Sequence, residues 1–223
     1  MEGIGLHTGA KVKMTFHPAK PNYGIKFQRV DLPDQPIIPA DVSQVHTTNR
    51  GTTLKSGEAT ISTIEHTLSA LVGLRIDNAL IEIDGPEAPI MDGSSLQILE
   101  ALQKVGRQEQ EEEREYFEVT EPISYKDPET GSELLALPAD DFHLTTLIDF
   151  NSPVLGHQYA SLENLDDYGQ QIAPCRTFVF LHELEVLLDQ GLIKGGDLDN
   201  AIVIVDRLLD PDDIDRLAEK LGK

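Results

Sequence analysis

Apolar residues recur at helical spacing in the first half of the chain, and a short strand-like run follows them. Three of them, Ile64, Leu68 and Leu71, lie on one face of a helix predicted over 62–72. After a glycine, the largely apolar run over 77–84 predicts a strand. The local order is therefore helix, turn, strand.

The second half repeats this order. A helix is predicted over 183–190, a turn over 191–196 and a strand over 199–206. The two predicted strands, 77–84 and 199–206, are identical at four of their eight positions, which supports an internal duplication.

Each half also opens on an alternation of apolar and polar positions, over 12–16 and over 142–150, which predicts strands. A further helix is predicted over 94–105. Strands that precede helices in both halves indicate an α+β fold with two similar units, each a mainly antiparallel sheet packed against its own helices. We expect the second unit to be incomplete, because its last predicted helix runs into Lys223.

Acidic residues gather between the two halves. Five of the seven positions over 109–115 are glutamate, which is typical of a solvated linker. We therefore expect a first α+β unit over 1–108, an acidic linker over 109–115 and a second unit over 116–223.

Composition excludes several classes of protein. The net charge of −21 argues against a nucleic-acid partner held through its phosphates. The chain has no apolar run long enough for a membrane helix and no basic-then-apolar leader segment. Its single cysteine, Cys175, excludes an internal disulfide and fits a reducing compartment. We expect a cytoplasmic protein without a membrane span.

The candidate chemistry lies at the start of the first predicted helix, in the run Ser62-Thr63-Ile64-Glu65-His66. A carboxylate and an imidazole in a first helical turn can both reach a small site beyond the helix N-terminus, where the helix dipole stabilises an anionic base or an oxyanion. Two structural interpretations compete. Ser62 and Glu65 fit a capping box that serves only the helix start, and His66 fits a buried, hydrogen-bonded histidine.

Four sequence blocks point beyond these local interpretations. They are GIGLHTG at 3–9, STIEHTLSAL at 62–71, PIMDGS at 89–94 and RTF at 176–178. In their order and separation they resemble the UDP-3-O-acyl-N-acetylglucosamine deacetylases, a zinc-dependent family of lipid A biosynthesis, and the resemblance covers nearly the whole chain. The second half further resembles members that are fused downstream to a 3-hydroxyacyl carrier-protein dehydratase.

The resemblance implies a role for individual residues. By position, His66 resembles a zinc ligand, Glu65 the general base, and Thr177 the hydroxyl that stabilises the oxyanion. Leu6 and Phe178 resemble residues that line the substrate and acyl-chain site. Without the family, Thr177 also fits a helix cap and Phe178 a core position. The implied reaction is hydrolytic removal of acetate from the 2-acetamido group of UDP-3-O-acyl-N-acetylglucosamine.

The implied zinc site is incomplete in this chain. The family's two other ligands are a histidine and an aspartate four positions later, and none of the seven histidines here has an aspartate at that spacing. Because a catalytic zinc site takes three protein ligands, we expect the chain to be inactive alone. The alternative is a catalytically inert protein of the same fold that binds a UDP-sugar or an acyl chain.

Overall fold

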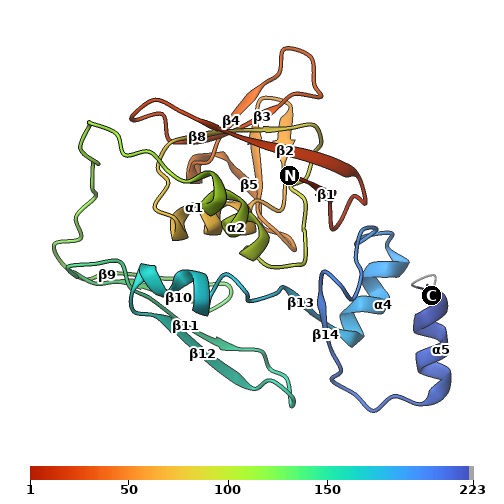
Figure 1. Cartoon of the computed structure of the whole chain (residues 1–223). Helices are drawn as coiled ribbons and strands as arrows, with labels where there is room; N and C mark the ends of the chain where they lie inside the picture. The colour runs from red at the N-terminus through yellow and green to blue at the C-terminus, as the bar shows by residue number, and fades with distance from the viewer. Residues whose placement is uncertain (221–223) are drawn as a thin grey trace.

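The structure, a computed structural model, describes residues 1–220, apart from the side chains at 185, 211, 214, 217, 219 and 220 in two helices. Figure 1 shows the first half of the chain as a sheet with helices on one side, and the second half as two long hairpins followed by a smaller group of strands and helices. Within this described part, no helix combines the length and the apolar character needed to cross a membrane.

The first half is built on a five-stranded sheet. Its strands and those of a smaller neighbouring sheet are β1 (Glu2–Ile4), β2 (Lys11–Pro18), β3 (Ile25–Arg29), β4 (Ile37–Pro39), β5 (Val45–Thr47), β6 (Thr53–Ser56), β7 (Ala59–Ile61) and β8 (Ala79–Ile83). The large sheet has the order β1-β2-β8-β3-β4, and the small one β5-β6-β7. Only the β3–β8 pair is parallel. The mainly antiparallel sheet predicted for the first unit is therefore confirmed.

Two helices, α1 (Glu65–Gly73) and α2 (Leu96–Val105), cover one face of this sheet. Alternate residues of β8 are buried, as a strand with one face on a core requires. The helices contribute apolar side chains to the same core cluster, which includes Phe27, Ile81, Leu71, Ile98 and Leu99. Both helices predicted here are confirmed, with starts two or three residues later than expected.

The second half is organised differently. Its elements are β9 (Ile123–Lys126), β10 (Glu133–Ala136), β11 (Leu144–Asp149), β12 (His157–Leu162), α3 (Tyr168–Gln171), β13 (Phe178–Phe180), α4 (Leu181–Asp189), β14 (Ile202–Ile204) and α5 (Pro211–Lys220). Short 3-10 turns lie at Val42–Gln44 and Leu165–Asp167. The strands form three separate two-stranded sheets, of which β13–β14 is parallel.

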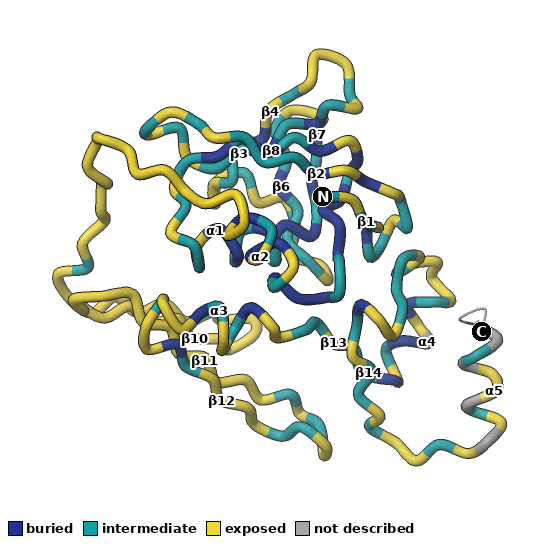
Figure 2. Tube along the Cα trace, viewed as in Figure 1, coloured by how far each residue is buried: buried dark blue, intermediate teal, exposed yellow. Residues whose placement is uncertain are grey.

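The α+β class is confirmed, but the expected likeness of the second unit to the first is not. The alternating run over 142–150 does contain strand β11, yet every residue of β11 is exposed. Figure 2 shows the same for most of the two hairpins. Alternation provides a face that can be buried, but burial requires an element to pack on it, and the described second half provides none for β11.

The acidic segment 109–115 carries neither a helix nor a strand, and its residues are exposed. Two interactions connect this segment to the first half. Gln110 Nε2 donates to the Ala19 carbonyl (2.8 Å), and Arg114 forms an ion pair with Asp77 (2.6 Å). The unit boundaries on either side of this segment stay a prediction. Positions 221–223 of the expected second unit lie outside the described residues.

Tyr168 joins the two halves. Its hydroxyl lies 2.5 Å from Ser69 Oγ on α1 and 2.7 Å from Ser95 Oγ at the start of α2. The ring is 4% exposed, and it packs so closely on Gly73 that a Cβ there would lie 2.1 Å from a ring carbon. The segment that begins at α3 is therefore held directly against the helices of the first half.

Candidate functional site

The start of α1 does not have the capping box that Ser62 and Glu65 could have formed. The N-cap of the helix is Ile64, which makes no side-chain capping bond, and Ser62 is not at the cap. The Ser62 hydroxyl instead donates to the Pro86 carbonyl (3.1 Å). The capping-box interpretation is therefore wrong, because the chain is still bridged to its neighbours at Ser62 and becomes helical only at Glu65.

Glu65 faces a neighbouring loop. Its Oε2 accepts a hydrogen bond from the Thr52 N–H (3.2 Å). In the same loop Arg50 pairs with Glu183 on α4 (3.1 Å), and the Arg50 guanidinium holds the pKa of Glu183 below its usual value. The loop that orients the Glu65 carboxylate is thus itself tied to the second half.

His66 lies beside Glu65 and is partly buried. Burial lowers the pKa of its imidazole, and the negative charges of Glu65 and Asp92 act in the opposite direction. A lowered pKa favours the neutral ring, which has the lone pair that a metal ligand needs.

The described residues do not complete a metal site around His66. Among the side chains that the structure describes, no three from His, Cys, Asp or Glu come together in a way that could hold an ion. A catalytic zinc site takes three protein ligands. Within the described side chains His66 is therefore at most one member of such a ligand set, and the incomplete zinc site expected from the sequence stays a prediction.

Thr177 reaches the first half through the segment that contains Asp92. Its N–H donates to the Gly93 carbonyl (2.7 Å), and the neighbouring Arg176 Nε donates to the Asp92 carbonyl (2.7 Å). Thr177 precedes strand β13 and not a helix, so the helix-cap interpretation is wrong. Asp92 therefore interacts on both sides: its charge acts on His66, and its carbonyl accepts from the side chain of Arg176, which precedes Thr177.

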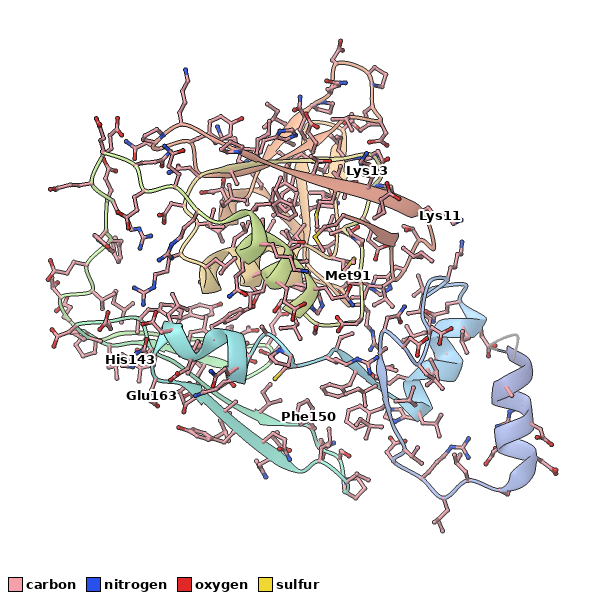
Figure 3. The ribbon with its side chains drawn as sticks, in the orientation of Figure 1. Lys11, Lys13, Met91, His143, Phe150 and Glu163 are labelled. Atoms are coloured by element: carbon pink, nitrogen blue, oxygen red, sulfur yellow. The ribbon has the colours of Figure 1, made fainter. Side chains whose placement is uncertain are left out.

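Phe178 is not a core residue. It is 39% exposed, and its ring lies edge-on to Phe150 (5.4 Å between centroids) and Phe180 (5.7 Å). Figure 3 labels Phe150, which directly follows β11 at the tip side of the second hairpin. These three rings form an accessible apolar surface next to Thr177.

Leu6 lies in the loop over 5–9, which contacts the second half. The Leu6 carbonyl accepts a hydrogen bond from the Gly195 N–H (3.0 Å), and the His7 carbonyl accepts from the Lys194 N–H (3.3 Å). A Cβ on Gly195 would lie 2.3 Å from the Gly5 carbonyl oxygen, so this approach requires glycine.

The described contacts link some of the predicted residues. Glu65 and His66 open α1, the charge of Asp92 acts on His66, and the neighbouring Gly93 bonds Thr177. Leu6 and Phe178 lie on other segments, and the grouping of all five into one site stays a prediction. The family model for UDP-3-O-acyl N-acetylglycosamine deacetylase matches residues 1–219. The chain belongs to this family.

Relatives agree with the assignment to the UDP-3-O-acyl N-acetylglycosamine deacetylase family. A protein of Porphyromonas gingivalis named "Bifunctional enzyme LpxC/FabZ" is 49% identical over all of this chain and 48% of its own length. A protein of the same name from Chlorobaculum tepidum is 46% identical over all of this chain and 48% of its own length. A Bdellovibrio bacteriovorus protein named "UDP-3-O-acyl-N-acetylglucosamine deacetylase" is 42% identical over 92% of this chain and 67% of its own length. The chain spans about half the length of the bifunctional relatives it matches.

One residue of this deacetylase-family chain was missed by sequence reasoning. Glu87 is fully buried, and its carboxylate accepts hydrogen bonds from the backbone N–H groups of His7 and Thr8 and from the hydroxyls of Thr8 and Thr63. Burial alone would raise the pKa of Glu87, but these bonds together outweigh it and keep the pKa below its usual value. The only signal in the sequence is a charged residue in an otherwise apolar, proline-flanked run over 86–90.

Proposed function

We propose that the whole protein to which this chain belongs removes acetate from the 2-acetamido group of UDP-3-O-acyl-N-acetylglucosamine, a step of lipid A biosynthesis in the cytoplasm. The observation that carries the proposal is the position of Glu65: its carboxylate has no capping role and lies beside the partly buried His66 at the start of α1. The family match and the names of the relatives support the choice of substrate. The bifunctional relatives lead us to propose a fused dehydratase domain as a partner.

In this proposal Glu65 accepts a proton from water while the water oxygen forms a bond to the acetamide carbon. The Thr177 hydroxyl donates a hydrogen bond to the carbonyl oxygen as it becomes negative. The bond from carbon to nitrogen then breaks, the nitrogen takes up a proton, and acetate and a free amine leave. Leu6 and the exposed ring of Phe178 provide apolar contacts for the acyl chain.

The proposed cofactor is zinc, with His66 as one ligand. Since the described residues bring no three suitable side chains together, we expect the 223-residue chain to lose zinc on dialysis and to retain well below one ion per chain. Metal analysis by mass spectrometry measures this directly. One tightly held zinc per chain that disappears in His66→Ala would contradict it and reveal a complete site.

Acetate release tests the function. The whole protein is expected to release acetate from UDP-3-O-acyl-N-acetylglucosamine, and His66→Ala is expected to reduce release to background. His143→Ala is the matched control, because His143 is an exposed histidine of the second hairpin. Among the described ion pairs its ring contacts only Glu163, at 3.6 Å (Figure 3). A protein that binds the substrate but releases no acetate would instead support the inert binding function.

A further inference from the structure

Glu87 is a buried ionised group that the proposed reaction does not use. Its two oxygens together accept from His7 N (2.9 Å), Thr8 N (2.9 Å), Thr8 Oγ1 (2.7 Å) and Thr63 Oγ1 (2.8 Å). A charge that is fully withdrawn from water is tolerated only when such bonds satisfy it. The buried carboxylate of Glu87 is therefore stabilised by donors from two separate segments of the chain.

The first of these segments is the loop over 5–9. Gly5 lies so close to Glu87 that a Cβ on Gly5 would be 2.5 Å from Glu87 Oε2. Carbonyl groups of the same loop accept hydrogen bonds from the N–H groups of Lys194 and Gly195 of the second half. The loop is thus held between Glu87 and the second half, and it carries Leu6.

The second segment is the turn that leads into α1. Thr63 has a φ of 57°, a left-handed conformation that is unfavourable for a β-branched residue. Its hydroxyl bonds Glu87, and the backbone of the preceding Ser62 bonds both neighbours of Glu87: Ser62 N to the Pro86 carbonyl and Ala88 N to the Ser62 carbonyl (3.0 Å each). The turn that delivers Glu65 is therefore anchored around Glu87.

We propose that Glu87 is a positioning residue whose ionised side chain fixes the loop over 5–9 and the turn at Thr63 in one arrangement on either side of the site. Glu87 makes no contact with substrate in this role. The predicted effect on turnover rests on the proposed function, whereas the effect on the two segments does not.

Glu87→Gln tests the proposal with little change of size. An amide has only one accepting oxygen. In either orientation of the glutamine amide, its NH2 group therefore faces the backbone N–H of His7 or of Thr8, and that N–H loses its acceptor. Native-state hydrogen exchange at these two amides in the 223-residue chain is expected to accelerate roughly tenfold or more. In the whole protein, kcat is expected to fall and KM to rise roughly tenfold each, because Glu65 and Leu6 are both displaced.

The KM separates positioning from loss of folded protein. A partly unfolded population lowers the apparent kcat and leaves KM unchanged, while a displaced loop raises KM. Asp84→Asn is the matched control: Asp84 also accepts a backbone N–H, that of Lys13 (2.6 Å), but it is exposed and lies outside the site, so both constants should remain at their wild-type values. Thr63→Val removes one hydroxyl donor and keeps the side-chain shape, and it provides a milder form of the same change if Glu87→Gln does not fold.

Two results would overturn the proposal. One is a wild-type rate of hydrogen exchange at the His7 and Thr8 amides in both Glu87→Gln and Thr63→Val. The other is accelerated exchange with unchanged kcat and KM. If the wild-type whole protein releases no acetate, the proposed function fails, and hydrogen exchange alone then decides whether Glu87 fixes the two segments.

Discussion

Glu65→Gln is expected to lower the rate of acetate release by the whole protein roughly 10²- to 10⁴-fold, the usual contribution of a positioned general base. Glutamine retains the size of the side chain, and its amide oxygen can still accept the Thr52 N–H. It cannot accept the proton from water. Because Glu65 does not cap α1, the free energy of unfolding should stay within about 0.5 kcal/mol of the wild-type value.

Acetate release and urea unfolding measured on the same preparations separate the two effects. Glu100→Gln, an exposed substitution of the same type on α2, should leave both quantities unchanged. A folded Glu65→Gln protein with nearly wild-type turnover would remove Glu65 from the mechanism.

Gly93→Ala is expected to destabilise the protein by about 2–5 kcal/mol, the sum of a left-handed backbone cost and a steric clash. Gly93 has a φ of 84°, and a Cβ there would lie 2.0 Å from the Asn200 carbonyl oxygen. The Gly93 carbonyl also accepts the Thr177 N–H, so a shift of Gly93 that relieves the clash disturbs Thr177 as well. Acetate release should therefore fall more than the loss of folded protein explains.

Gly106→Ala is the matched control for this change. Gly106 has a similar φ of 77°, but no atom lies within 4 Å of the position that its Cβ would take. It should show only the backbone cost of about 1–3 kcal/mol in urea unfolding, because its ψ of −178° places it in a region that other residues rarely adopt. Equal destabilisation by the two substitutions would show that the contact between Gly93 and Asn200 does not constrain the second half.

The parts of the fold that could be predicted from the sequence are those whose signal is local. Helix α2 follows from its apolar spacing and from Gly106, whose N–H bonds the Leu102 carbonyl at the helix end. The order helix, turn, strand was likewise predicted correctly in both halves. The burial of β11 could not be predicted, because alternation is a property of one strand and burial depends on a second element.

The candidate site divides in the same way. Glu65, His66 and Thr177 are proposed as site residues because they lie in recognisable blocks. The competing capping interpretation is excluded only by the position of Ser62 in three dimensions. Glu87 was missed because its donors are 24 to 80 residues away in the sequence. The burial and ionisation of a carboxylate depend on such distant partners, and the neighbouring residues in the sequence show no periodic pattern that predicts them.

The order of strands in the large sheet has a consequence for synthesis of the protein. β2 and β3 are consecutive large-sheet strands in the chain, but β8 lies between them and pairs with both. Until the ribosome has released residues 79–83, each of these strands keeps an unpaired edge that can join another nascent chain. Assembly of the sheet therefore waits for β8, the last strand of the first half, and such distant pairings form slowly. During the interval between the synthesis of β3 and that of β8, the unpaired edges of β2 and β3 therefore expose the nascent chain to misassembly.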